Sequence, residues 1–266
     1  MGADPLLDWY ETVRRPLPWR FTRDPWAILV SEVMLQQTQA ARVVPHYERF
    51  LARFPSPRVL ADASAAEAIA AWSGLGYNRR VLALRATARA VAEDGWPPPE
   101  RLEELPGIGP YTAAALGSFA WDAPMAAVDT NVRRVIERRD GLRRTPRALA
   151  RRAAELVPQG RAAAWNQAMM ELGATVCRPR RPRCGECPLR VGCAGPDAVA
   201  PAPRPRAERF EGSDRWARGR LLAALVAGER PPELGVGGDG LRERALAGLA
   251  RDGLVVRDAG GEPRLP

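Results

Sequence analysis

The sequence contains no lysine: all 40 basic residues are arginine, and with 31 acidic residues they leave a formal net charge of +9. Without a lysine side chain, only the N-terminal amine could form a Schiff base, and nothing in the sequence directs it to a site. The positive charge suits a polyanionic partner such as nucleic acid. An arginine-rich codon usage produces the same excess on an ordinary solvated surface, so charge alone favours nucleic acid only weakly.

Long apolar segments are also missing. No run of about 18 apolar residues occurs, and the first residues, MGADPLLDWYETVRR, lack the apolar core of a secretory signal. We therefore expect no membrane span and a cytoplasmic protein associated with the nucleoid. The single histidine, His46, lies in an apolar helical stretch, and we interpret it as structural.

Apolar residues recur with helical spacing through residues 1–195, and no stretch of similar length alternates with period two. Asp24-Pro25, for example, is a cap followed by a proline in the first turn. The pattern predicts an all-α fold. The predicted helices are 25–37, 40–54, 65–72, 79–92, 111–119, 130–138, 147–156 and 165–176.

The composition changes at residues 196–208, a stretch rich in Pro, Ala and Arg that predicts a stiff, extended linker. The tail beyond it, 209–266, contains two helical patterns and then short apolar segments around a Gly-Gly turn. A winged-helix-like tail and a simple small helical tail fit this pattern equally well. The segments concerned are 215–227, 241–251, 254–256, 260–261 and 264–265.

Four cysteines have the spacing C-x6-C-x2-C-x5-C. Structural zinc sites usually draw on two close pairs, and only one C-x2-C pair is present. Single ligands on either side of one pair can wrap a [4Fe–4S] cluster, so the spacing favours iron–sulfur over zinc. Arginines between the cysteines suit phosphate binding, although the metal site could also serve only to staple the fold. The cysteines are Cys177, Cys184, Cys187 and Cys193.

A glycine-rich turn, Leu105-Pro-Gly-Ile-Gly-Pro-Tyr-Thr112, separates a charged stretch from an apolar one. The backbone of Gly107, Ile108 and Gly109 can turn tightly and present N–H groups to a phosphate at the start of a helix. An ordinary helix–turn–helix connection has a similar composition, so this segment alone favours DNA binding only modestly.

The turn and the cysteine cluster together resemble the helix-hairpin-helix superfamily of base-excision glycosylases, which includes endonuclease III. The resemblance covers residues 5–195. Within the superfamily, three strings are similar to the MutY-type adenine glycosylases: SEVMLQQTQ at 31–39, GLGY at 74–77 and NQAMMELG at 166–173.

The resemblance implies a six-helix barrel domain plus a helical domain that carries a [4Fe–4S] cluster. The barrel would comprise 24–128, with the helix-hairpin-helix at 105–112, and the cluster domain would comprise 1–23 plus 129–195. These parts form a catalytic core over 1–195, followed by the linker and the tail.

The implied function is hydrolysis of the N-glycosidic bond of adenine mispaired with guanine or 8-oxoguanine in double-stranded DNA, by a monomer. Strand-cutting relatives use a lysine Schiff base, so we expect a monofunctional enzyme. Two alternatives stay open: a glycosylase that removes thymine from T:G mismatches, and a non-enzymatic iron–sulfur regulator that binds DNA.

Glu32 lies among apolar residues, which should raise the pKa of its carboxyl, as a proton donor requires. A lone glutamate on an exposed helix face is the plain alternative. The resemblance implies that Glu32 protonates N7 of adenine, which is otherwise a poor leaving group.

Asp129 precedes a predicted helix and fits an N-cap, where helix N–H groups hold a carboxylate ionised. Capping alone would explain this residue. The resemblance implies that Asp129 stabilises the sugar cation or attaches to it transiently, and that Asn131 assists. Tyr111 stands where strand-cutting relatives carry lysine; packing of its ring on the core is the alternative.

The resemblance also implies contacts with the target DNA. Gln37 and Tyr77 would act as wedges in the duplex, and Thr38 would lie near the opposing base. Family members often carry a second tyrosine where this chain has Asn78, which weakens the detailed prediction for that wedge. The residues expected to line the adenine pocket are Trp19, Arg20, Leu35 and Glu171.

MutY-type enzymes often carry a large C-terminal domain, related to Nudix hydrolases, that recognises 8-oxoguanine. Only about 60 residues follow the predicted linker, too few for that fold. They look instead like the short tails of actinobacterial-type relatives. We therefore expect adenine excision with a weaker, or differently built, preference for 8-oxoguanine.

Overall fold

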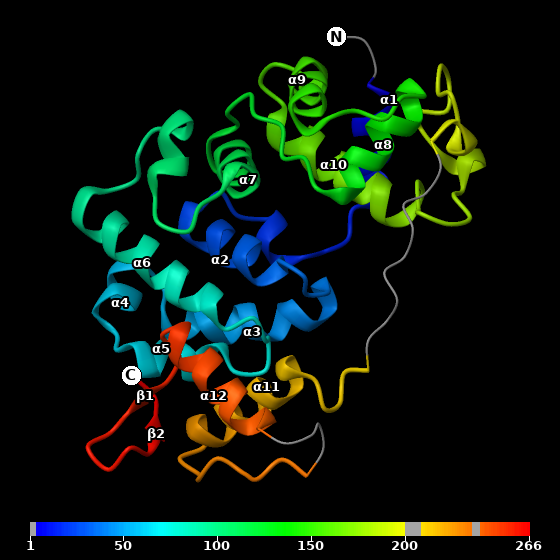
Figure 1. Cartoon of the computed structure of the whole chain (residues 1–266). Coiled ribbons are helices and arrows are strands. Elements are labelled where there is room, and N and C mark those ends of the chain that lie inside the picture. Colours follow the sequence, from blue (N-terminus) through cyan, green and yellow to red (C-terminus); the bar gives the residue numbers. More distant parts are fainter. Residues whose placement is uncertain (1–3, 200–208, 236–239) are drawn as a thin grey trace. The chain divides into compact units, whose positions relative to one another are not determined.

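The computed structural model describes residues 4–199, 209–235 and 240–266. They pack as two compact units (Figure 1). The first unit comprises the described residues of 1–32, 97–104 and 108–204, and the second those of 33–96, 105–107 and 205–266. Within the described ranges, no helix is both long and apolar enough to span a bilayer.

The first unit is built from helices and short 3₁₀ turns. Its longest interfaces join α8 to α10, α1 to α10, and α7 to both α10 and η2. Helix α2 (Pro25–Leu35) begins in this unit and ends in the second. The other elements are α1 (Pro5–Val13), η1 (Pro18–Arg20), η2 (Pro99–Glu104), α7 (Pro110–Trp121), α8 (Thr130–Asp140), α9 (Pro146–Leu156), α10 (Ala162–Thr175), η3 (Cys184–Glu186) and η4 (Pro196–Ala198).

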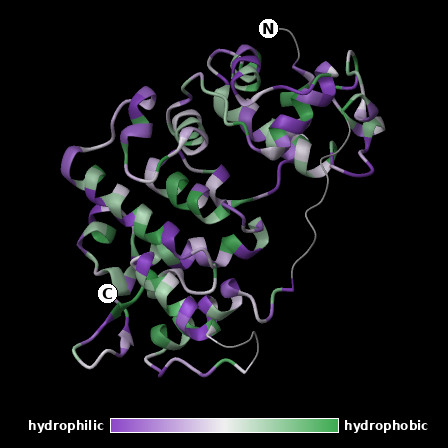
Figure 2. Cartoon of the chain, viewed as in Figure 1, coloured by the Kyte–Doolittle hydropathy of each residue, from purple (hydrophilic) through white to green (hydrophobic). Residues whose placement is uncertain are grey.

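Two helices owe their burial to apolar residues on every side. In α7, every residue from Thr112 to Ala120 is buried. In α2, buried residues run from Trp26 to Met34, and Figure 2 shows this helix as largely hydrophobic. A helix that is apolar all round belongs in a protein interior, so polar groups on α2 and at the start of α7 lie in a largely apolar environment.

The second unit contains the remaining helices and the one pair of strands among the described residues. Helix α6 packs on α4 and α5, α3 contacts α5, and α11 packs on α12 and α5 (Figure 1). The elements are α3 (Ala40–Arg53), α4 (Pro57–Asp62), α5 (Ala65–Trp72), α6 (Arg79–Asp94), α11 (Asp214–Val226), α12 (Leu241–Arg251), β1 (Val256–Arg257) and β2 (Pro263–Arg264).

The all-α prediction is confirmed, and the predicted helices match within a few residues at each end. Two helices, α1 and α4, were not predicted. Each begins with a proline, at Pro5 and Pro57. In α1 the side chain of Asp4 also caps the backbone N–H groups of Leu6 and Leu7.

The strands are shorter than the apolar pattern predicted. Val256 pairs with Arg264, and Arg257 with Pro263. Leu254 and Val255 are buried outside the ladder, so their apolar character serves packing. In the predicted linker, 196–198 form the turn η4 and 200–208 lie outside the described residues.

Candidate active site

Glu32 is a carboxyl buried in the first unit. It lies on α2 and is 5% exposed, so the exposed-face alternative is wrong. Burial raises the pKa of Glu32 to about 7; a hydrogen bond from the Tyr111 phenol opposes this rise, and the negative charge of Asp129 adds to it. The carboxyl can therefore hold a proton near neutral pH and release it, as a general acid must.

Asp129 caps the N-terminus of α8, as predicted. Its Oδ1 accepts hydrogen bonds from the backbone N–H groups of Asn131 at 2.8 Å and Val132 at 2.7 Å. Its Oδ2 accepts a third bond from the Asn131 side chain, also at 2.8 Å. These three donors satisfy both carboxylate oxygens and fix the direction of the Asp129 side chain.

Asn131 is in turn held by Arg134. The Arg134 guanidinium donates to Asn131 Oδ1 at 2.8 Å and to the backbone carbonyls of Gly173 at 2.6 Å and Cys177 at 2.7 Å. A hydrogen-bonded chain thus joins the Asp129 carboxylate to the backbone of the first cysteine.

Gly173 allows α10 to approach α8 at this point. A Cβ at Gly173 would lie 2.5 Å from the Cβ of Asn131 and 3.0 Å from its backbone. Such contacts are too close for any other residue, so Gly173 is required where the two helices meet beside Asn131.

Glu171, on α10, is a second buried carboxylate, but it is ion-paired. Arg15 donates to it at 2.7 and 3.0 Å, and Arg20 at 2.6 Å. Burial acts to raise the pKa of Glu171, but the hydrogen bonds from both arginines outweigh it and lower the pKa. The pKa values of the two buried carboxyl groups thus move in opposite directions: that of Glu171 is lowered, which favours the carboxylate, and that of Glu32 is raised, which favours the protonated acid. Of the residues predicted to line the adenine pocket, Arg20 and Glu171 are thus in direct contact. Trp19, which precedes Arg20 in the chain, is buried.

In the second unit, Arg80 organises two loops that carry predicted DNA contacts. Its Nη1 donates to the carbonyls of Val33 at 2.7 Å, Met34 at 3.1 Å and Gln36 at 2.6 Å, at the C-terminal end of α2. Its Nη2 donates to Gly76 O at 3.0 Å and to Thr38 Oγ1 at 3.4 Å. One guanidinium thus holds both the loop after α2 and the loop before α6.

The predicted wedge residues project from these two loops. Gln37 has a φ of 58° and Tyr77 a φ of 49°, left-handed conformations that are uncommon for residues with side chains. Both side chains are exposed, Tyr77 by 41%. Leu35 and Thr38 are partly exposed in the same unit. Strained backbone held by a partly buried cation is typical of functional loops.

The glycine-rich turn is fixed by packing against α6. Gly107 has a φ of +78°, and a Cβ there would lie 2.8 Å from the Cβ of Ala83. Thr87 also donates to the carbonyl of Pro106 at 2.5 Å. Gly109 caps α7 with no side-chain hydrogen bond to its first turn. The turn therefore brings backbone rather than side chains to the start of α7.

The four cysteines are free thiols on one irregular segment of the first unit. Burial raises the pKa of the Cys187 thiol, a hydrogen bond from the backbone of Leu189 opposes this rise, and the charges of the other three cysteines add to it. Arg138, 5% exposed, donates to Arg178 O at 2.7 Å and Pro179 O at 2.9 Å and lies 3.6 Å from Cys177 Sγ. A buried cation thus fastens the segment to α8.

This donor set suits a cluster better than a single ion. Among the described residues, no three or more His, Cys, Asp or Glu side chains are grouped to hold one metal ion. A cubane has a different requirement, because each thiolate binds its own iron. Four thiols on one segment, with Cys177 Sγ beside the Arg138 guanidinium, fit such a group.

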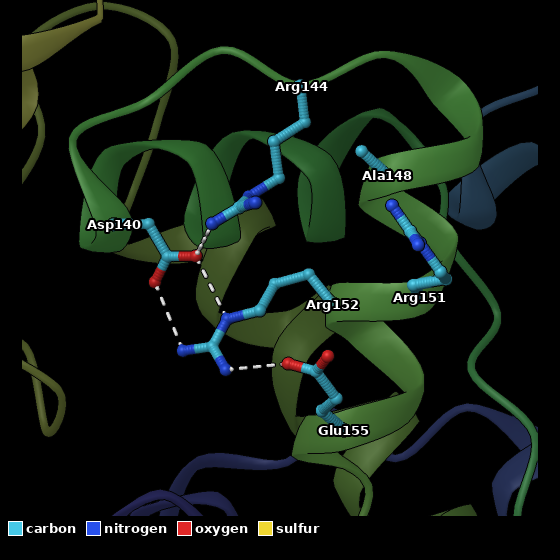
Figure 3. Close-up of a pocket in the computed structure, with 6 residues that line it drawn as sticks. All are labelled: Asp140, Arg144, Ala148, Arg151, Arg152 and Glu155. Atoms are coloured by element: carbon cyan, nitrogen blue, oxygen red, sulfur yellow. Dashed lines mark hydrogen bonds and ion pairs between the residues drawn. The ribbon is translucent and has the colours of Figure 1, made fainter.

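A polar pocket lies elsewhere in the first unit, between α8 and α9, and contains none of the predicted site residues. Asp140 accepts from Arg144 at 2.7 Å and from Arg152 at 3.0 Å, and Arg152 also binds Glu155 (Figure 3). The charges of this pocket are largely satisfied within it, so we assign it no role.

Comparisons with known proteins agree with this geometry. The family model "HhH-GPD superfamily base excision DNA repair protein" matches residues 30–159. Over 98% of its length the chain is 43% identical to an adenine DNA glycosylase of Mycobacterium tuberculosis, covering 92% of that protein. It is also 43% identical to the Mycolicibacterium smegmatis adenine DNA glycosylase, over 96% of this chain and 93% of that one. The chain belongs to the adenine DNA glycosylase family.

Solved structures show the glycosylase fold. A thermostable thymine-DNA glycosylase is 32% identical with a TM-score of 0.68, over 73% of this chain and 94% of that one. An endonuclease III trapped on DNA has a TM-score of 0.62 at 22% identity, over 72% and 93% of the two chains. The helix-hairpin-helix fold predicted from the sequence is therefore confirmed.

Three arginines of this glycosylase were not predicted to act at the site. Arg80, Arg134 and Arg138 are each at least partly buried and donate to backbone carbonyls. One feature of the sequence could have indicated a role for two of them: Arg134 and Arg138 follow Asn131 by one and two helical turns, and so lie on the same face of the helix. Nothing in the sequence indicated which carbonyls they would reach.

Proposed function

We propose that this glycosylase removes adenine mispaired with guanine or 8-oxoguanine from double-stranded DNA, acting as a monomer and without cutting the strand. One observation carries the proposal. Glu32 is buried, has its pKa raised to about 7 and interacts with Tyr111 and Asp129. The site thus combines a carboxyl that can give up a proton near neutral pH with a capped carboxylate.

The two carboxyl groups have different roles in the reaction: Glu32 is the acid, and Asp129 stabilises the sugar. Glu32 donates its proton to N7 of the flipped adenine, so that the base leaves as a neutral molecule. Asp129 offsets the positive charge on the sugar, or bonds to it transiently, while Asn131 holds it in place. Water then adds to the sugar carbon and returns a proton to Glu32. The logic parallels glycoside hydrolysis by paired carboxyl groups.

Tyr111 keeps the reaction hydrolytic. Burial, together with the charges of Glu32 and Asp129, raises the pKa of the Tyr111 phenol well above its ordinary value, so the phenol stays protonated. It can donate a hydrogen bond to Glu32 but cannot form an imine with the sugar, and the chain has no lysine to do so.

Other residues hold the DNA. Gln37 and Tyr77 act as wedges, Thr38 lies near the opposing base, and Trp19, Arg20, Leu35 and Glu171 line the adenine pocket. The backbone of Gly107, Ile108 and Gly109 binds phosphate, in keeping with the side-chain-free turn at the start of α7. A substrate in genomic DNA places the site of action at the nucleoid.

The four cysteines would hold a [4Fe–4S] cluster, which supplies a rigid tie for the arginine-rich segment 177–193. Arg178, Arg180 and Arg190 on this segment then present guanidinium groups to DNA phosphates. In this arrangement 24–128 serve as the barrel, 1–23 plus 129–195 as the cluster domain and 209–266 as a winged-helix-like tail.

A mismatch panel tests the proposal. Wild type and Glu32→Gln are incubated in single-turnover mode with A:G, A:8-oxoguanine, A:T, T:G and G:C duplexes, and alkali is added to reveal abasic sites. We expect wild type to act on the first two only, and Glu32→Gln to lose about 10²- to 10⁴-fold in rate. Strand breaks before alkali would contradict hydrolysis alone, and undiminished activity of the variant would contradict the role of Glu32.

Thymine removal from T:G mismatches is the second candidate, because the similar solved structure with a TM-score of 0.68 is described as a thymine-DNA glycosylase. Tyr111 is compatible with both reactions. Cleavage of T:G and not of A:G in the same panel would establish this second candidate.

A further inference from the structure

Residues of the C-terminal tail lie beside a predicted wedge residue in the second unit. Arg215, the second residue of α11, donates from Nη1 to the phenol oxygen of Tyr77 at 3.2 Å. The two residues are 138 positions apart in the sequence. The guanidinium also lies over the ring of Phe210, 4.9 Å from its centroid.

The tail is anchored where Tyr77 precedes α6. Asp252 forms ion pairs with Arg218 of α11 and, at 3.6 Å, with Arg79 at the start of α6. Helix α11 contacts α5, and a Cβ at Gly253 would be in ordinary contact with Leu82 of α6. These contacts hold Arg215 in place beside Tyr77.

Arg215 is exposed and forms no ion pair within the described part of the chain. The acidic side chains nearest to it in sequence are engaged by other arginines: Asp214 by Arg244 at 3.9 Å, and Glu211 by Arg209 at 3.9 Å. A guanidinium has five N–H donors, and one donated to a phenol leaves most of its fork for an anion. The charge is thus uncompensated and available.

The surroundings are suited to nucleic acid. Tyr77 is 41% and Phe210 53% exposed, so both aromatic rings are accessible to a ligand. Arg80 lies under the Tyr77 ring, 5.5 Å from its centroid, and ties it to the loop that carries Thr38. Exposed aromatic rings interleaved with guanidinium groups form a platform for bases and phosphates.

We propose that the tail is part of the DNA-binding surface: Arg215 holds the Tyr77 wedge by its hydroxyl and binds a DNA phosphate next to the mispair. The inference rests on the proposed function, because that function makes Tyr77 a wedge. It assigns to 209–266 a direct role in binding the mismatch, carried by one arginine.

The test measures equilibrium binding of the full-length, cluster-loaded protein to a duplex with a tetrahydrofuran abasic analogue opposite guanine, at several salt concentrations. Arg215→Ala should weaken binding roughly tenfold and reduce the slope of log K against log salt by about one. Arg215→Gln keeps a hydrogen-bond donor for Tyr77 but removes the charge. The slope of log K against log salt should therefore fall by the same amount as in Arg215→Ala.

Arg230→Ala is the matched control. It removes one arginine from the same tail, 82% exposed and 3.6 Å from Glu262. We expect a change in binding below about twofold, as for a rim charge. Equal effects of Arg215→Ala and Arg230→Ala would overturn the proposal, because total charge would then explain them.

A double-mutant cycle tests the link to Tyr77. Tyr77→Phe removes the hydroxyl and keeps the ring, so the loss caused by Arg215→Ala should be smaller in the Tyr77→Phe background than in wild type. Equal losses in both backgrounds would overturn the wedge-holding role.

The two proposals can fail separately. Binding to the abasic analogue needs no chemistry, so it reports on Arg215 even if wild type removes no adenine. If wild type excises adenine while Arg215→Ala binds as tightly as wild type, the inference on the tail is wrong and the proposed function stands.

Discussion

The phenol of Tyr111 donates a hydrogen bond to the carboxyl of Glu32, and this bond opposes the effect of burial on the pKa of that carboxyl. The tyrosine therefore lowers the pH at which Glu32 loses its proton, against the larger effect of burial. A lysine at the same position would place a positive charge beside Glu32 and would favour the carboxylate.

Tyr111→Phe should move the pH profile of adenine excision. Glu32 acts as an acid only when protonated, so wild-type activity should fall as the pH rises through about 7. Removing the phenol removes a bond that lowers the pKa of Glu32, so the fall should shift to higher pH. Single-turnover rates between about pH 5 and pH 9 measure the shift. An unchanged profile, or a shift to lower pH, would show that the phenol does not favour the carboxylate.

Glu32→Gln should stabilise the folded protein at alkaline pH. The pKa of Glu32 is raised from 4.5 to about 7 on folding, so between these values the folded state binds a proton that the unfolded state has lost. Wild-type stability therefore falls as the pH rises through this window, by about 3 kcal/mol in total. Urea unfolding should show nearly equal stability of variant and wild type near pH 4.5 and a more stable variant above pH 7.

The control for this comparison is Glu103→Gln, which removes a negative charge from an exposed side chain. Its difference from wild type should be small and nearly independent of pH. If Glu32→Gln behaved in the same way, Glu32 would not be an acid with a pKa raised by burial.

The burial of Glu32 and the capping position of Asp129 could be predicted from the sequence because both depend on neighbouring residues, whereas their roles were implied only by the family resemblance. Glu32 lies in an apolar stretch of a single helix, and Asp129 is followed directly by the helix that it caps. The distant partners of Arg80, Arg134 and Arg215 could not be predicted, because they come from segments far away in the chain. Arginine periodicity alone does not distinguish a guanidinium that caps carbonyls from one in solvent.

The end of one helix is likewise determined by residues distant in the sequence and not by its neighbours. The end of α2 was predicted at Gln37, but the helix ends at Leu35 and Gln37 adopts a φ of 58°. The carbonyls of Val33, Met34 and Gln36 there are bound by Arg80, whose position depends on packing of α6. Tertiary contacts, rather than local propensity, determine where this helix ends.

Arg80→Met should weaken DNA binding more than it alters the chemical step. The change leaves the carbonyls of Val33 and Gln36 without their donor and frees the loops carrying Gln37 and Tyr77. We expect roughly 10- to 100-fold weaker binding of an abasic-analogue duplex. Arg89→Met, which removes a single bond of 3.4 Å from the same helix, is the control and should change binding little. Equal effects of the two would argue against a special role for Arg80.

Gly173→Ala should destabilise the fold and slow excision together. The added methyl group would lie 2.5 Å from the Cβ of Asn131, so α10 must move away from α8 at the residue that holds Asp129. Overpacking of this kind costs about 1–3 kcal/mol. In α11, Gly219→Ala meets nothing within 4 Å and should instead stabilise the protein slightly. Urea unfolding and single-turnover rates are measured for both variants. Losses confined to Gly173→Ala would support the steric conflict, and equal losses in both would indicate a general effect of replacing glycine by alanine.

Arg138→Gln should reduce the amount of iron that the purified protein retains. Arg138 is buried and donates to the carbonyls of Arg178 and Pro179, so a shorter side chain leaves these acceptors unpaired and loosens the segment that begins at Cys177. The expected cost is about 1–3 kcal/mol of folding stability, with a lower iron content and weaker visible absorbance. Arg151→Gln removes an exposed arginine of α9 and should retain iron as wild type does. Full iron content in Arg138→Gln, together with wild-type stability, would show that the cluster segment holds its shape without this cation.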